Sequence, residues 1–320
     1  MAGRFVVRLV GRRLVTLIPV LVLVSFGVFM LVALVPGDPA VTLAGGTNAS
    51  PQAIARIRVQ LHLNQSLLMQ YWHWLIGVVH LDFGRSLLTG APVWHQIASR
   101  LPVTLSLVLA AGVVAVAVGI PIGVVSALRQ NGASDVGARL ATSVGISMPN
   151  FWLAVILVSV LSVRLRIFPP TGFTPISVSF EGWLRTVTLP ALSLGVGVAA
   201  VVARQLRRSL IEVLQAAYVR TAWAKGAGAG RVVVMHALKN AAIPAVTVLG
   251  IQIGYLLGGA VIIEQIFSVP GLGSYMLQGI TNHDLPVVQG VALVFVAFQM
   301  AMSLLVDISY GYLNPRVRSA

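Results

Sequence analysis

The two lysines of this 320-residue chain, Lys225 and Lys239, are the side chains that could bind nucleotide phosphates as P-loop lysines do. A P-loop requires the pattern G-x-x-x-x-G-K-[ST], in which the lysine reaches the phosphates. Lys225 is followed by glycine and Lys239 by asparagine, so neither fits this pattern. We therefore expect no catalysis and no cofactor on this chain, and any ATP chemistry must belong to a partner.

Carboxylates and histidines are the groups that ion-coupled carriers keep inside the membrane as relays or ion ligands. The chain has 8 acidic residues, and all lie outside the long apolar stretches or at their edges, as Glu264 and Asp307 do. A proton- or sodium-driven mechanism therefore has nothing obvious to titrate, although sodium sites built from backbone carbonyls stay open. His62, His73 and His80 could suggest a metal site, but they fit the polar edge of an amphipathic segment better, and we expect no metal.

Residues 215–244, QAAYVRTAWAKGAGAGRVVVMHALKNAAIP, form a basic, alanine-rich segment between two apolar runs. The sequence predicts a helix over Ile211–Lys225, which Gly226 ends, and a following span that Pro244 opens. Small side chains would make this helix thin, namely those of Ala216, Ala217, Ala222 and Ala224. Such a helix could enter the groove of another protein or lie on anionic lipid, and the residues alone do not decide between the two.

The elements that position this segment are apolar. Hydrophobic residues make up 57% of the chain and charged residues 9%, with a mean hydropathy of +0.91. Uncharged stretches of about 20 residues cross the hydrocarbon core of a membrane, and they must be helical because their backbone groups find no water there. The sequence predicts an all-α, polytopic membrane protein with six spans, approximately Leu14–Val35, Leu101–Leu128, Leu140–Val163, Thr186–Ala203, Ala241–Ile263 and Leu285–Val306.

Basic residues indicate the orientation of these spans. Of the 22 lysines and arginines, 15 lie in residues 1–13, 129–139, 204–239 and 311–320, and seven lie in the other loops. By the positive-inside rule the first group is cytoplasmic, and both termini with it. The net charge of +14 then mostly reflects the basic residues that mark the cytoplasmic ends of the spans. Nucleic-acid binding is not expected, because the sequence has no basic patch interleaved with aromatic residues. The first span is too long for a signal-peptide core, and we expect it to be a retained anchor.

The predicted organisation has three parts. Residues 1–98 form an N-terminal anchor helix with an external amphipathic segment, residues 99–310 form the transport core, and residues 311–320 form a cytoplasmic tail. Helical periodicity runs through residues 51–80, with Pro51 at a helix start. Its aromatic residues suit a membrane–water interface, so we expect this segment to lie against the membrane or another subunit.

Two motifs in the basic segment resemble the EAA-loop signature of peptide-class permeases in binding-protein-dependent ABC importers. They are Y-V-R-T-A-x-A-K-G at Tyr218–Gly226 and H-A-L-K-N-A-A-I-P at His236–Pro244. The generic E-A-A triplet is replaced by Arg220-Thr221-Ala222, as is usual in the peptide branch, whereas Trp223 is less typical. Further motifs match at Pro36–Ala40, Asp82–Val93, Glu264–Gly273 and Leu313–Arg318, so the resemblance covers essentially the whole chain. The first of these further resembles the B-type member of dipeptide-permease pairs.

This resemblance implies the ABC type I importer permease fold in the inner or plasma membrane. It also implies a second homologous permease, two ABC ATPase subunits that carry ATP and Mg, and an extracytoplasmic solute-binding protein. The substrate would be a small peptide, a dipeptide or an oligopeptide. Glutathione, a nickel chelate or another small solute is the alternative within the class, and an ion-coupled secondary transporter or a non-transport scaffold is the alternative outside it.

Particular residues acquire roles from the same resemblance. The helix that couples to the ATPase would present Tyr218, Arg220, Thr221, Ala222, Ala224, Lys225 and Gly226. External docking and gate loops would contain Gly37, Asp38, Pro39, Glu264, Phe267, Pro270, Gly271 and Gly273. The translocation path would be lined by Gln252 and Tyr255.

Overall fold

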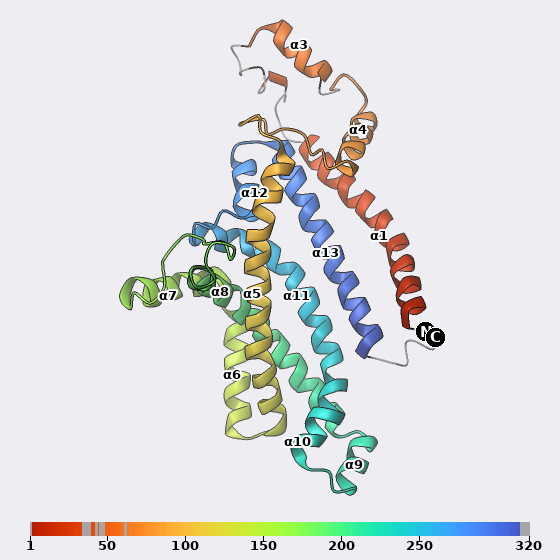
Figure 1. Cartoon of the computed structure of the whole chain (residues 1–320), viewed down its shortest axis with the longest axis vertical. Coiled ribbons are helices and arrows are strands. Elements are labelled where there is room, and N and C mark those ends of the chain that lie inside the picture. The colour runs from red at the N-terminus through yellow and green to blue at the C-terminus, as the bar shows by residue number, and fades with distance from the viewer. Residues whose placement is uncertain (1, 34–39, 42–43, 45–48, 61–62, 314–320) are drawn as a thin grey trace. The chain divides into compact units, whose positions relative to one another are not determined.

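The structure is a computed structural model that describes residues 2–33, 40–41, 44, 49–60 and 63–313 (Figure 1). Its regular elements in these ranges are helices, with one isolated bridge between Arg85 and Pro92. The chain forms two compact units. The first unit comprises the described residues of Met1–Leu14, Thr104–Val269 and Phe298–Ala320, and the second comprises those of Val15–Val103 and Pro270–Ala297.

The first unit is built around α8 (Phe180–Leu214). Of the 18-residue apolar stretch that qualifies this helix as a membrane span, 67% is buried inside the protein. Its other elements are most of α5 (Val93–Leu128), α6 (Ala133–Ser147), α7 (Asn150–Leu157), a π-helical segment η2 (Val158–Arg164), α9 (Ala217–Ala224), α10 (Ala229–Arg231), a second π-helical segment η3 (Val232–Leu238), α11 (Lys239–Ile266) and the end of α13 (Leu285–Leu313). The beginning of α1 (Ala2–Ala33) also belongs to this unit.

Close contact between α5 and α8 depends on glycine. A Cβ atom on Gly119 would lie 2.7 Å from the carbonyl oxygen of Ala199, and one on Gly195 would lie 2.7 Å from that of Ala111. Neither distance is compatible with a side chain unless the helices move apart. Membrane helices use small residues in this way.

The third predicted span is not one straight helix. Its two halves, α6 and the pair α7–η2, meet at an angle of 101°. Pro149 has no N–H to continue the helix and disfavours a helical conformation at the preceding residue. Met148 is accordingly extended, with φ −79° and ψ 120°, and Pro149 becomes the N-cap of α7.

The second unit contains the rest of α1, α3 (Pro51–Gln60), α4 (Leu67–Val79), α12 (Leu272–Thr281) and the first parts of α5 and α13. Its core consists of Phe83, Val93, Ile97, Leu272, Tyr275, Val287, Val291 and Leu293. Helix α3 begins at Pro51, as predicted. Helix α4 packs on α1 of the same chain, where the Tyr71 hydroxyl lies 2.8 Å from Ser25 Oγ and the Tyr71 ring meets Phe26 edge-on.

A loop in the second unit explains the motif at Asp82–Val93. The Asp284 carboxylate, 4% exposed, accepts hydrogen bonds from Ser86 Oγ at 2.5 Å and from the Leu87 amide at 3.0 Å. The side chain of Ser86 in turn accepts from the amide of Thr89. The loop is thus fixed by a residue 198 positions away, between α12 and α13.

Among the described residues, four helices are long and apolar enough to cross a membrane, or five elements if the bent pair counts as one span. They correspond to the predicted second to sixth spans. The first predicted span lies on α1, where the described apolar stretch covers Ile18–Met30 and is shorter than a full crossing. The number six therefore stays a prediction, as does the division into residues 1–98, 99–310 and 311–320.

Candidate functional site

The basic loop between α8 and α11 is the candidate site, and its helix begins later than predicted. Instead of one helix over Ile211–Lys225, α8 continues to Leu214 and α9 starts at Ala217. Ala216 between them is extended, with φ −67° and ψ 146°. At about 100° per residue, Leu210 and Val219 would point to opposite sides of an unbroken helix. Both are fully buried, and the break makes this geometry available.

The end of α9 is as predicted. Gly226 has φ +78°, and its amide donates to the carbonyl of Trp223 at 2.9 Å, while the Ala227 amide donates to that of Ala222 at 3.2 Å. This pair of bonds is a Schellman motif, in which glycine adopts the left-handed conformation that other residues avoid. No atom lies within 4 Å of a Cβ built on Gly226. Backbone conformation and not space therefore restricts this position.

The two motifs that resemble the EAA loop, Tyr218–Gly226 and His236–Pro244, contact each other through a side-chain hydrogen bond. Asn240 Nδ2 donates a hydrogen bond to the Tyr218 hydroxyl at 2.9 Å and another to the carbonyl of His236 at 3.2 Å. On the other side of α9, Val219 is fully buried. These contacts attach α9 to η3 and to the start of α11, and in Figure 1 α9 and α10 form the turn that joins α8 to α11.

Pro244 does not open the following span, in contrast to the prediction. Helix α11 begins at Lys239 and follows directly on η3, and Pro244 lies inside it. The neighbouring small side chains pack on α8 in a cluster of Ala127, Leu206, Leu210, Ala237, Ala241 and Ala245. The junction between α9 and the long helices is therefore packed, and α10 begins already at Ala229.

The outward surface of α9 is basic and partly aromatic. Six of the seven predicted coupling residues are exposed, namely Tyr218, Arg220, Thr221, Ala224, Lys225 and Gly226, and Ala222 is half-buried. Trp223, with 45% of its surface exposed, is beside them. Residues 213–263 contain no acid. The helix is thus thicker than its alanine content suggested, and its outward surface suits an acidic or apolar partner.

Sequence reasoning missed the residue that holds α8 to α6. The Asp135 carboxylate, fully buried, accepts from Arg207 Nε at 2.7 Å, from Arg207 Nη2 at 2.9 Å and from Ser126 Oγ at 2.5 Å. Asp135 lies in the predicted 129–139 loop, outside the spans, and hydrogen bonds from Arg207 and Ser126 hold its pKa well below the ordinary value. A single acid in a loop otherwise basic was the available signal.

The predicted outer residues fall into three groups. Gly37, Asp38 and Pro39 lie outside the described residues. In the first unit, Glu264 and Phe267 are buried, and the Glu264 carboxylate accepts from Thr104 Oγ1 at 2.6 Å. In the second unit, Gly271 and Gly273 are buried and Pro270 is exposed. Glu264 and Phe267 are thus buried within this chain, and the docking and gate roles of these loops stay predictions.

The two predicted path residues share one exposed side of α11. Tyr255 is 69% exposed and Gln252 is half-buried. Ile251, Gly258 and Ile262 are exposed on the same side, because spacings of three and four bring residues onto one face of a helix. We refer to Ile251, Tyr255, Gly258 and Ile262 as the α11 stripe. As for metals, His62 lies outside the described residues, and among those described no group of three or more His, Cys, Asp or Glu could hold an ion.

Family comparisons match almost the whole chain. Residues 119–319 match the binding-protein-dependent transport system inner membrane component, and residues 4–108 match the N-terminal part of such a membrane component. A putative peptide transport system permease protein of Brucella abortus (strain 2308) is 43% identical over 310 residues, covering 97% of this chain and 98% of that protein. The dipeptide transport system permease protein of Escherichia coli (strain K12) is 38% identical over 330 residues, covering 96% and 97%.

Two further comparisons concern a permease named for another substrate and a solved structure. A glutathione transport system permease protein of Salmonella choleraesuis (strain SC-B67) is 41% identical over 308 residues, covering 96% of this chain and 97% of that protein. The solved structure of the MetNI methionine ABC transporter in inward-facing conformations has a chain that superposes with a TM-score of 0.58 at 18% identity. This superposition covers 68% of the present chain and 96% of the other, and at this identity it shows a shared fold.

Proposed function

The chain belongs to the family of binding-protein-dependent transport system inner membrane components, and from this premise we propose that it forms half of the path of an ATP-driven importer for small peptides. It is a multi-pass membrane permease subunit of the ABC class. The second half would be a homologous permease, ATP would be hydrolysed by two ATPase subunits, and a solute-binding protein would deliver the substrate. Relatives named for peptides, dipeptides and glutathione support a peptide-sized cargo.

The observation that carries this proposal is the attachment of α9. This short helix is exposed on one side, and on the other it is fixed to η3 and α11 through Val219, Tyr218 and Asn240. A force applied to α9 would therefore reach the long helices without being lost in a flexible link. A groove on an ATPase, the helix-in-groove mode of recognition, is the partner surface we propose. Its contacts would come from Arg220 to Gly226, including Trp223.

The α11 stripe supports the path. Its exposed isoleucines and Tyr255 are uncovered within this chain, and a second permease would enclose them. We propose that Gln252 and Tyr255 face the space between the two permeases. The uncharged spans argue against ion coupling, because an ion-driven carrier would need titratable groups inside them.

Gly226 offers a test of coupling with a matched control. Gly226→Val should destabilise the left-handed cap by about 1–2 kcal/mol, roughly tenfold in the population of the docked helix, because a β-branched residue disfavours positive φ. Gly226→Asn should be tolerated, since asparagine accepts this conformation. Both add a side chain into open space. We expect valine to lower peptide uptake and the recovery of copurifying ATPase together, and asparagine to preserve both.

Two outcomes would count against this proposal. Equal uptake and equal ATPase recovery in Gly226→Val and in the unaltered protein would remove α9 as the coupling helix. Loss of uptake on addition of a protonophore, at constant ATP, would indicate an ion-coupled carrier. Competition of labelled dipeptide uptake by unlabelled dipeptide, glutathione and a nickel chelate would rank the substrates.

The orientation is a separate part of the proposal. We propose that α9 and both termini are cytoplasmic, as the basic residues indicate. The chain contains no cysteine, so single cysteines report accessibility cleanly. A cysteine at Ser179 or Thr281 should react with an impermeant maleimide on intact cells, and one at Ala229 should react only after permeabilisation. Labelling of the Ala229 position from outside would reverse the orientation.

A further inference from the structure

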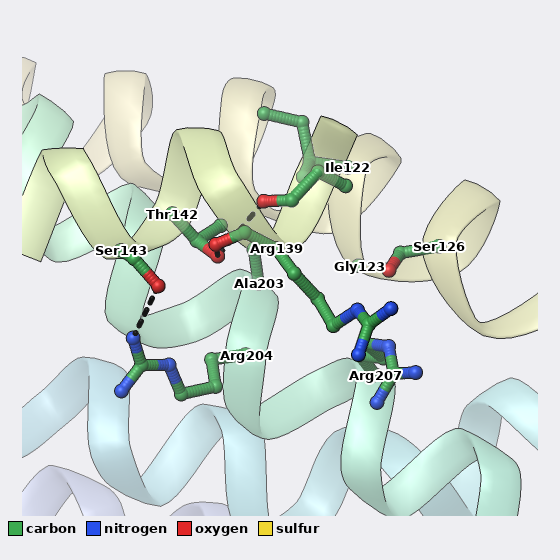
Figure 2. A pocket seen from close by; sticks show the side chains of 10 residues that line it. Ile122, Gly123, Ser126, Arg139, Thr142, Ser143, Ala203, Arg204 and Arg207 are labelled. Carbon is green, nitrogen blue, oxygen red and sulfur yellow. Dashed lines mark hydrogen bonds between the residues drawn. The ribbon is translucent and has the colours of Figure 1, made fainter. Parts of the chain in front are cut away.

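A cavity of about 290 Å³ lies within the first unit, beside the Asp135–Arg207 pair that joins α6 to α8 (Figure 2). It has no role in the proposed coupling. Three helices contribute its lining, and its polar side chains are those of Ser126 on α5, Arg139, Thr142 and Ser143 on α6, and Arg204 and Arg207 on α8. The volume is close to the lower end of the range for small-ligand sites.

The cavity carries an excess of positive charge. Three guanidinium groups line it, and the nearby carboxylate is that of Asp135, which pairs with Arg207 at 2.7 Å and with Arg139 at 3.7 Å. Arg204 interacts with Ser143 Oγ at 3.5 Å, and in the part of the chain that the structure describes it pairs with no carboxylate. One carboxylate against three guanidinium groups leaves this site electropositive.

The available donors suit oxygens of an anion. In Figure 2 the guanidinium of Arg204 points toward Ser143, whereas Arg139 and Arg207 extend to the other side of the cavity. Arg139 keeps 52% of its side chain exposed, and Arg204 is exposed as well. A guanidinium presents a planar fork that binds two oxygens of a phosphate at once. Ser143 adds a hydroxyl beside that fork.

The position of the cavity along the helices identifies its level in the membrane. Its lining residues on α5 precede the end of the predicted span at Leu128, those on α6 surround the start at Leu140, and those on α8 begin at the predicted end, Ala203. The three predicted spans thus reach the membrane surface here. Apolar side chains of Ile122, Ala138 and Ala203 form the remaining wall. Basic pockets between membrane helices at this level bind anionic headgroups.

We propose that this cavity binds a phosphate group, carried either by an anionic phospholipid headgroup or by a soluble phosphate ester. The apolar wall beside the arginines provides a surface for the glycerol and first acyl carbons of a lipid. Arg204 is the anchor, because Arg207 is committed to Asp135. The site would hold α5, α6 and α8 together at the membrane surface, independently of α9.

Lipid retention by the full-length chain, purified in detergent with its coexpressed partner subunits, tests the proposal. Native mass spectrometry would count bound phosphatidylglycerol against phosphatidylcholine at equal concentration. Arg204→Ala should weaken phosphatidylglycerol binding about fivefold, the effect of one arginine near an anionic lipid surface. Arg204→Lys should weaken it less, because the charge stays and the fork is lost.

Arg208→Ala is the matched control. Arg208 follows one turn later on α8, is 78% exposed, pairs with Glu212 and does not line the cavity. Both substitutions remove one positive charge from the same helix. Inorganic phosphate, compared with chloride at equal ionic strength, gives the second arm through the unfolding temperature. Stabilisation by phosphate that requires Arg204, without retained phosphatidylglycerol, would support the site and assign it to a soluble source.

The proposal fails if Arg204→Ala and Arg208→Ala lose the same amount of phosphatidylglycerol, because the effect would then be general surface charge. It also fails if neither phosphatidylglycerol nor phosphate distinguishes Arg204→Ala from the unaltered protein. Arg204 has a single long hydrogen bond and an exposed side chain, so its replacement should leave the fold intact.

Discussion

Two buried aspartates, one in each unit, fix loop backbone by different means. Asp135 of the first unit accepts a two-bond fork from Arg207 and one bond each from Ser126 Oγ and the Asn131 amide. Asp284 of the second unit accepts from Ser86 Oγ and from two backbone amides. The first site buries a pair of opposite charges, and the second satisfies a carboxylate with neutral donors.

The difference reflects what each site must join. Asp135 links α6 to α8, two helices that face each other through side chains. The long side chain of Arg207 reaches across this contact and keeps 22% of its surface exposed. Asp284 holds a loop whose backbone amides are themselves the groups that need partners. A neutral arrangement avoids the burial of a second charge, whereas an ion pair depends strongly on both members.

The largest effect should come from breaking the charged site. Asp135→Asn removes the charge that balances Arg207, and loss of one member of a buried pair costs about 3 kcal/mol. We expect a clear fall in the unfolding temperature of the purified protein in detergent. Glu212→Gln is the control, because it breaks the Arg208–Glu212 pair, whose members are 78% and 67% exposed, and a surface pair contributes about 0.5 kcal/mol.

The double variant Asp135→Asn with Arg207→Gln sharpens the same comparison. It removes both charges and should recover part of the lost stability, since no unbalanced guanidinium stays near the interior. Equal unfolding temperatures for Asp135→Asn and Glu212→Gln would show that the Asp135–Arg207 pair contributes no more than a surface pair.

A smaller effect should follow from the neutral site. Asp284→Asn keeps one acceptor oxygen and places an amide group near backbone donors, at a cost of about 2 kcal/mol. Because the loop at Ser86 would loosen, trypsin should cut after the exposed Arg85 faster than in the unaltered protein. Asp82→Asn, which changes an exposed aspartate that accepts from the Gly84 amide, should leave this rate nearly unchanged. Unaltered cleavage in Asp284→Asn would show that the loop is held by other contacts.

Local signals predicted local structure well. Gly226 ended its helix because glycine readily adopts the left-handed conformation of a helix cap, and Pro51 began one because proline fits the first helical turn. The apolar runs of 18 or more residues marked where the long helices lie. Such features depend on a few neighbouring residues, so a single sequence contains them.

Contacts between distant segments could not be read in this way. Ser86 and Asp284 are 198 positions apart, and neither belongs to a pattern that points to the other. The break between α8 and α9 occurs at Gln215 and Ala216, where no glycine or proline marks the end of a helix. It follows from the burial of both Leu210 and Val219. Pro149 explains why the third predicted span bends, but the angle of 101° depends on packing around both halves.

The π-helical segment Val232–Leu238 sets the phase between the two ends of its long helix. Its backbone hydrogen bonds join residues five positions apart instead of four, so each bond encloses one residue more than in an α-helix. One surplus residue rotates everything that follows by about 100° around the helix axis. The azimuth of the α11 stripe relative to Ala229–Arg231, at the start of the same helix, is therefore determined by these seven residues. A one-residue insertion or deletion there would rotate the stripe relative to that start, although α11 kept its sequence and length.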